Sequence, residues 1–145
     1  MVIGDNNVIA KVTETAKAFF TTCEAGKGWE ACKGYCTSDA TFSAQAEPLA
    51  EIKTLRDYTE WMKGLLATLT DGTYDLKSFA TDAERNNVSA YAVFMGTHLA
   101  NGPCPPTGKK AVTDYVRVME FKDDKIVHVT KIWNSNSAFE QLGWN

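Results

Sequence analysis

The second half of the chain holds four stretches of β-prone sequence in succession. Turn sequences separate them, and they cover residues 74–82, 87–99, 111–122 and 125–133. The pair Asp123-Asp124 joins the last two and predicts a tight hairpin. Strands joined in this way form an antiparallel sheet, whose apolar face must pack against other elements.

The first half of the chain supplies helices for that packing. Apolar side chains recur every three or four residues over 8–24, and a second such stripe covers 52–69. Shorter elements are expected as a helix at 29–35, a strand at 40–45 and a final helix at 137–142. The predicted fold class is therefore α+β: a curved antiparallel (mixed) sheet that forms a cone, with three N-terminal helices packed over it and a short C-terminal helix. Residues 1–145 are expected to form a single domain.

Composition excludes several classes of protein. The formal net charge is only -3 and no basic block is present, so we expect no nucleic-acid partner. Apolar residues make up 44% of the chain, which indicates a globular protein. No apolar run has the length of a membrane span, and the start Met1-Val2-Ile3-Gly4-Asp5 does not resemble an export signal. We therefore expect a cytoplasmic protein with no membrane partner.

The cysteine pattern favours thiols over disulfides or a metal centre. Two bridges would suit an exported protein, which the N-terminus does not indicate. Cys32 and Cys36 are four residues apart, but Cys23 and Cys104 do not form the second close pair that a zinc site needs. We expect Cys32 and Cys36 to be small buried groups. No metal and no cofactor are expected.

A curved sheet covered by helices encloses a pocket for a small, largely apolar ligand. If Trp133 points into the cone, then Val129 and Lys131 do so too, and their neighbours face the other way. On the preceding strand the inward set is Tyr115, Arg117, Met119 and Phe121, and the outward set is Asp114, Val116, Val118 and Glu120. The predicted ligand-binding residues are Arg117, Tyr115, Trp133 and Met119 from the strands and Tyr58 and Trp61 from the helix at 52–69.

Several segments carry a resemblance to a known superfamily. Residues 38–42, 94–98, 105–109 and the ending that runs from 124–126 to Gln141-Leu142-Gly143-Trp144 resemble the nuclear-transport-factor-2-like superfamily. The last three together are similar to the SnoaL-like polyketide and ester cyclases. The resemblance implies a cone-shaped homodimer. It also implies an aldol-type ring closure in which an acidic residue removes a proton next to a carbonyl group, without metal or cofactor.

The sequence departs from that family at the positions that matter for catalysis. Counted back from Gln141-Leu142-Gly143, the family's catalytic aspartate falls on Lys131, and its partner histidine falls near Arg117. The ketosteroid isomerase pattern fits no better, because its tyrosine falls near Phe19 and its base near Ala44 or Gln45. The usual acid–base pair is therefore absent.

Other residues are candidates for the missing chemistry. A β-bulge would swap the faces of a strand and bring Asp114, Glu120 or His128 inward. We regard Asp114 as a candidate base because it lies beside Tyr115 and across the hairpin from Trp133. His98 is a second candidate base, at a strand end near the expected pocket mouth, and Lys131 is the third catalytic candidate.

Two cations on neighbouring strands leave two interpretations open. Lys131 and Arg117 either clamp an anionic group of a ligand, or pair internally with Asp114, Glu120 or Asp39. The protein is accordingly expected to be a cofactor-free cyclase, isomerase or lyase acting on a ketone, or a non-catalytic binder of a small apolar or anionic molecule. The outward set with Val116, Val118, Thr130 and Ile132 is apolar and predicts a homodimer through the convex sheet face.

Overall fold

The computed structural model describes residues 3–145, with side chains from residue 7 onward. The helices are α1 (Ile3–Glu24), α2 (Trp29–Cys32), α3 (Leu55–Thr68) and α4 (Ser135–Leu142). The strands are β1 (Cys36–Ala44), β2 (Thr73–Asp82), β3 (Asn87–Thr97), β4 (Lys110–Lys122) and β5 (Lys125–Trp133). Short 3₁₀ turns cover Lys33–Tyr35 and Glu47–Leu49.

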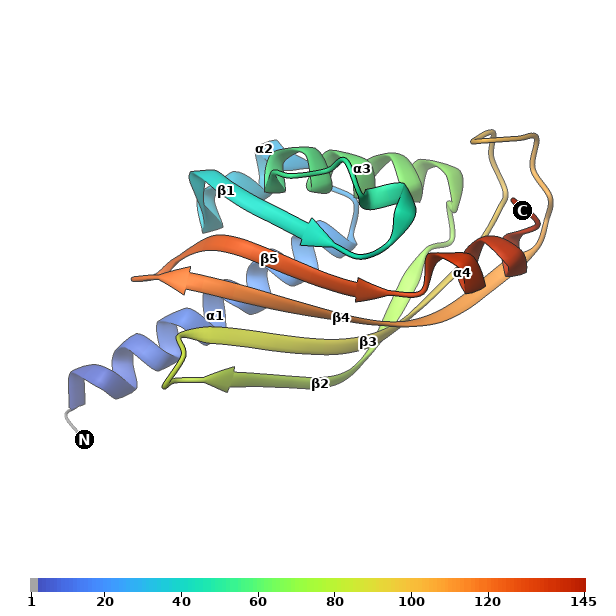
Figure 1. The fold of residues 1–145 in the computed structure, drawn as a ribbon. Coiled ribbons are helices and arrows are strands. Elements are labelled where there is room, and N and C mark those ends of the chain that lie inside the picture. Colours follow the sequence, from blue (N-terminus) through green and yellow to red (C-terminus); the bar gives the residue numbers. More distant parts are fainter. Residues whose placement is uncertain (1–2) are drawn as a thin grey trace.

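The five strands form one curved sheet in the order β1-β5-β4-β3-β2. The strand β1 is parallel to β5, and all other neighbours are antiparallel. In Figure 1 the long strands run side by side, α2 and α3 lie on the side of β1, and α4 lies next to the C-terminus. This arrangement confirms the predicted α+β cone with a mixed sheet.

The helices differ from their predicted ranges mainly at their starts. The helix α1 begins at Ile3, five residues before the predicted start. The starts of two other helices are set by side chains that cap them. The Thr54 hydroxyl accepts the Asp57 N–H at 3.1 Å, so α3 starts three residues after the predicted start. The Asn134 side chain accepts the Ser137 N–H at 3.1 Å, so α4 starts two residues before it. None of the described helices is long and apolar enough to cross a membrane.

The strands bury alternate side chains as the sequence predicted. On β4 the residues Tyr115, Arg117, Met119 and Phe121 are buried, while Asp114 and Glu120 on the other face are exposed. A β-bulge interrupts the β4–β5 register between Glu120 and Phe121. The bulge lies next to the hairpin turn, so it leaves the inward direction of Val129 and Lys131 unchanged.

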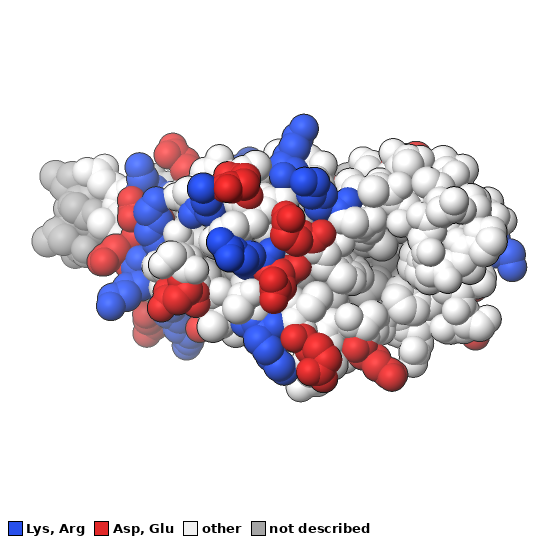
Figure 2. All heavy atoms as spheres, turned by 90° about the horizontal axis from the view of Figure 1, so that it is seen from above, with Lys and Arg blue, Asp and Glu red and all other residues white. Residues whose placement is uncertain are grey.

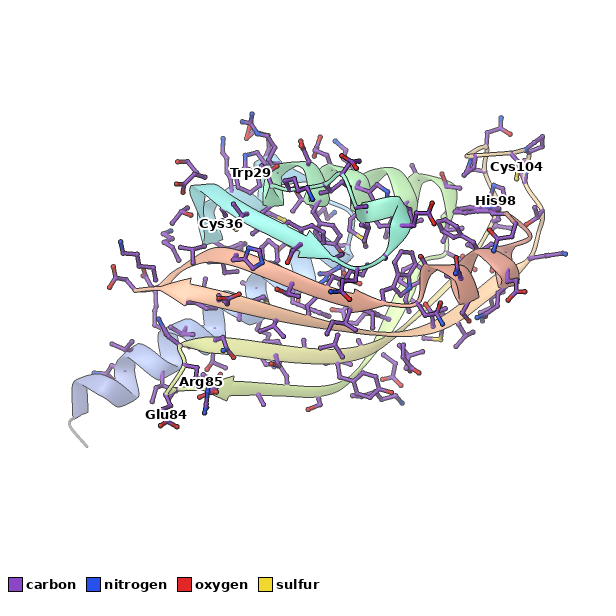
Figure 3. All side chains as sticks on the ribbon, viewed as in Figure 1. Trp29, Cys36, Glu84, Arg85, His98 and Cys104 are labelled. Atoms are coloured by element: carbon purple, nitrogen blue, oxygen red, sulfur yellow. The ribbon has the colours of Figure 1, made fainter. Side chains whose placement is uncertain are left out.

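The cysteines pack as small side chains. Cys32 and Cys36 are buried, as predicted, and so is Cys23. Cys104 is half-buried in the long loop between β3 and β4, far from Cys36 in Figure 3. All four thiols are free.

Candidate functional site

A narrow cavity lies between the concave face of the sheet, α3 and α4. The space that the centre of a water-sized sphere can occupy in it is only about 20 Å³, so a ligand larger than a water molecule must displace side chains of its wall. Most of its wall is apolar, and its lining residues are Glu24, Met62, Leu65, Leu69, Phe94, Ala111, Thr113, Tyr115, Lys131, Trp133, Ala138, Phe139 and Leu142. Such a composition suits a small apolar ligand whose orientation is set by a few polar groups.

The polar side chains of the cavity belong to a buried network. The Tyr115 hydroxyl donates to Oε2 of Glu24 at 2.6 Å, and the other carboxylate oxygen forms an ion pair with Arg117. Arg117 donates through Nη2 to the Tyr58 hydroxyl, and Nζ of Lys131 donates to the same oxygen at 3.1 Å. Five side chains from α1, α3, β4 and β5 are thus linked by direct contacts.

Lys131 holds an amino group in an unusual environment. Its Nζ atom lies 4.6 Å from the ring centre of Trp133 and between 5.3 and 5.5 Å from those of Tyr58, Tyr115 and Trp61. Burial, and then the positive charge of Arg117, lower the pKa of Lys131 to about 7. The aromatic faces offset only part of that cost. Near neutral pH a large share of this amine is therefore uncharged.

Arg117 is fully buried but retains its charge. Although burial disfavours the charged form, the Glu24 carboxylate holds the pKa of Arg117 well above its ordinary value. The prediction that Arg117 pairs with Asp114, Glu120 or Asp39 was wrong, because its ion-pair partner is Glu24. Arg117 does not line the cavity either, so the structure does not support an anion clamp built from both cations.

Asp114 does not reach the cavity. It lies on the outer face of β4, where its carboxylate accepts a hydrogen bond from the Tyr91 hydroxyl at 3.0 Å. The only β4–β5 bulge lies beyond Glu120, so the strand around Asp114 keeps its regular alternation. The hypothesis that Asp114 is a base in the pocket was therefore wrong.

His98 fastens the long loop instead of lining the cavity. It is fully buried, and Figure 3 shows it at the base of that loop. Its Nδ1 atom accepts the Thr107 N–H at 3.2 Å and the indole N–H of Trp144 at 2.9 Å. With Nδ1 occupied by two donors, the ring proton lies on Nε2. His98 thus ties the loop to the C-terminal tail and offers no free basic nitrogen.

The remaining predicted residues fall into two groups. Tyr115, Lys131 and Trp133 line the cavity, as expected. Tyr58, Trp61 and Met119 do not form its wall. Tyr58 lies behind Lys131 as its hydrogen-bond acceptor, Trp61 contacts Lys131 from α3, and Met119 is part of the core.

A shallow groove on the surface adjoins the cavity. The two share Leu65 and Phe139, and the groove has no charged lining residue: Pro48, Trp61, Gly64, Leu65, Thr68, Pro103, Phe139 and Trp144. Figure 2 shows this end of the molecule largely free of charge, whereas charged side chains gather toward the other end. An uncharged surface beside the cavity favours an uncharged ligand.

Glu24 is the charged site residue that the sequence analysis missed. It is 3% exposed although it lies at the end of a helix, where a carboxylate normally meets solvent. A signal was present, because Glu24 continues the four-residue spacing of Val12, Ala16 and Phe20 on the apolar stripe of α1.

Comparison with known proteins agrees with this geometry. A family model described as a SnoaL-like domain matches residues 16–129. No curated protein matches significantly. Among solved structures, AclR from Streptomyces galilaeus, a candidate hydroxylase, is 17% identical with a TM-score of 0.75, over 94% of this chain and 87% of its own.

Two further structures resemble the fold. IdmH from Streptomyces antibioticus, a candidate polyketide cyclase, is 20% identical with a TM-score of 0.70, over 90% of this chain and 96% of its own. A candidate SnoaL-like polyketide cyclase from Jannaschia sp. CCS1 is 12% identical with a TM-score of 0.77, over 95% of both chains. At these identities the structures show a shared fold.

Proposed function

Because this chain belongs to the SnoaL-like domain family, we propose that it performs cofactor-free acid–base chemistry on an apolar ketone, with Lys131 as the base. The environment of Lys131 carries the proposal: a cavity-lining amine whose pKa of about 7 leaves it partly uncharged at neutral pH. The carboxylate of Glu24 is a poor alternative, because Arg117 and Tyr115 occupy its two oxygens.

The cavity also offers a partner for the ketone oxygen. The Thr113 hydroxyl oxygen accepts the indole N–H of Trp133 at 3.3 Å, which leaves its own hydrogen for a ligand. When Lys131 removes a proton next to the carbonyl group, the resulting ammonium stabilises the enolate that forms. Isomerisation, lyase chemistry and aldol ring closure all begin with this step. The candidate cyclases among the structural neighbours support a ketone-bearing substrate.

Hydrogen–deuterium exchange next to the carbonyl group of benzylacetone tests this function. We expect the protein to catalyse the exchange, followed by NMR, and Lys131→Met to lower the rate about a hundredfold, as for the loss of a general base. The rate should rise with pH through about 7, because only the uncharged amine accepts a proton. Lys122→Met, at an exposed position on β4, is the matched control and should leave the rate unchanged. Equal rates for Lys131→Met and the unmodified protein would refute the assignment.

A non-catalytic binder is the second candidate function, and the absence of the family's acidic residue favours it. Counted back from Gln141-Leu142-Gly143, that position falls on Lys131, and the buried Glu24 is already paired. A ligand that binds only the folded protein raises its melting temperature. Benzylacetone that raises the melting temperature without any deuterium exchange would support this function over catalysis.

We propose in addition that the convex sheet face forms a homodimer in a cytoplasmic protein. Ile132 is 63% exposed there and Val112 is 49% exposed, beside the half-buried Val116 and Val118. Apolar patches of this kind mark interfaces. Sedimentation equilibrium should show a dimer at micromolar concentration, and Ile132→Lys should weaken it at least tenfold because it buries a charge in the contact. A monomer at that concentration would contradict the proposal.

A further inference from the structure

Lys131 is placed to do more than accept a proton. The residue lines the cavity, and its Nζ atom has the Tyr58 hydroxyl as its only hydrogen-bond partner among the described residues. No carboxylate among the residues that the structure describes forms an ion pair with Lys131. A buried ammonium without a counter-ion is costly, so the uncharged amine is favoured.

An uncharged amine in an apolar cavity is a nucleophile toward carbonyl carbon. Desolvation and a neighbouring cation are the two features that activate lysines for this chemistry, and Lys131 has both, the cation being Arg117. The rings of Tyr58, Trp61, Tyr115 and Trp133 surround Nζ and limit the access of water, which would hydrolyse a covalent product.

We propose that Lys131 captures an apolar ketone or aldehyde as a Schiff base, so that the ligand is held covalently at the polar end of the cavity. This inference rests on the proposed function, because it uses the same uncharged amine and the same class of carbonyl ligand. Covalent capture and proton removal are alternative uses of Lys131, since the nitrogen of the Schiff base is no longer free to accept the C–H proton. Once it is protonated, a Schiff base withdraws electrons more strongly than the free ketone, and so makes the neighbouring C–H bond more acidic.

The bond changes balance without any further reactant. The nitrogen lone pair forms the C–N bond while the carbonyl π electrons move to oxygen, and the proton lost from nitrogen goes to that oxygen. The hydroxyl of the carbinolamine then takes the remaining proton of the nitrogen and leaves as water, while the nitrogen lone pair forms the C=N bond. Tyr58 accepts a hydrogen bond from Nζ and is therefore placed to relay a proton between nitrogen and oxygen. Burial raises the pKa of Tyr58 well above its ordinary value, so its hydroxyl is protonated when the reaction begins.

The groups that face Lys131 set the pH range for this reaction. They are Cys23 and Glu24 of α1, Tyr58 of α3, and Tyr115 and Arg117 of β4. Burial and Arg117 together outweigh Glu24, so capture should reach half its maximum near pH 7. Exposed lysines have an ordinary pKa of about 10.4 and should remain charged near pH 7.

Reductive trapping tests the Schiff base directly. The full-length protein is incubated with benzylacetone, or with hexanal as a smaller carbonyl probe, and borohydride then reduces the C=N bond. We expect mass spectrometry to find a single adduct, mapped to Lys131 and at least tenfold more abundant than labelling at any other lysine. Lys131→Met should abolish that adduct, and Lys122→Met should retain it. Circular dichroism of both variants verifies that they are folded.

The outcomes separate this inference from the proposed function. In water enriched in heavy oxygen, a Schiff base exchanges the carbonyl oxygen of benzylacetone, whereas simple proton removal does not. Deuterium exchange that depends on Lys131, without trapping or oxygen exchange, would overturn the Schiff base and leave the proposed function intact. Adducts spread evenly over surface lysines would also overturn it. Loss of deuterium exchange, trapping and oxygen exchange together would reject both proposals.

Discussion

Glu24→Gln should lower the free energy of unfolding by about 3–5 kcal/mol, the usual cost of removing one member of a buried ion pair. The substitution keeps the size of the side chain but removes the negative charge that faces Arg117, which is 0% exposed. It also weakens the acceptor of the Tyr115 hydroxyl. Urea unfolding monitored by tryptophan fluorescence measures the change.

Two comparisons isolate the buried charge as the cause. Glu30→Gln removes a carboxylate from the exposed pair with Lys33 and should leave stability nearly unchanged. The double substitution Glu24→Met with Arg117→Met removes both charges together and should recover most of the loss, because apolar side chains of similar volume replace buried ion pairs without penalty. A loss of less than about 1 kcal/mol for Glu24→Gln would show that Arg117 does not depend on this partner.

The sheet and its two faces were predictable because their signals are local. Side chains alternate every two residues along a strand, so the buried positions of Arg117 and Lys131 follow from the sequence once the direction of Trp133 is fixed. The bulge near Phe121 was not predictable, but it lies outside the stretch that forms the site. The cone and its cavity could therefore be expected before any coordinates.

The partners across the cavity were not predictable in the same way. Helical spacing places Glu24 on the buried stripe of α1, but only tertiary packing brings it to Arg117, which is 93 positions away in the chain. Residue chemistry alone gave Asp114 and His98 as bases. The first faces solvent and the second has its acceptor nitrogen filled by the long loop and the C-terminal tail.

Lys131→Met should make the protein more stable, and by an amount that depends on pH. The pKa of Lys131 is about 7 in the folded protein against an ordinary value of 10.5. Between these values the unfolded chain binds the additional proton, so the stability of the unmodified protein rises as pH increases from about 7 to 10.5. Below about 7 the ammonium is buried in full, at a cost of about 5 kcal/mol from the difference between the two pKa values.

Methionine has nearly the same length and no charge, so it removes that cost and sacrifices one hydrogen bond to Tyr58. Urea unfolding at about pH 6 should give Lys131→Met a free energy of unfolding several kcal/mol higher than that of the unmodified protein. This difference in stability should disappear as pH approaches about 10. Lys122→Met, whose side chain is exposed, should show no such closing gap. The prediction fails if Lys131→Met has a lower free energy of unfolding than the unmodified protein at about pH 6, or exceeds it by the same amount at every pH. Either result would show that the folded protein stabilises the ammonium of Lys131. The amine would then not be free to act as base or nucleophile at neutral pH, so this stability measurement bears on the chemistry without any knowledge of the substrate.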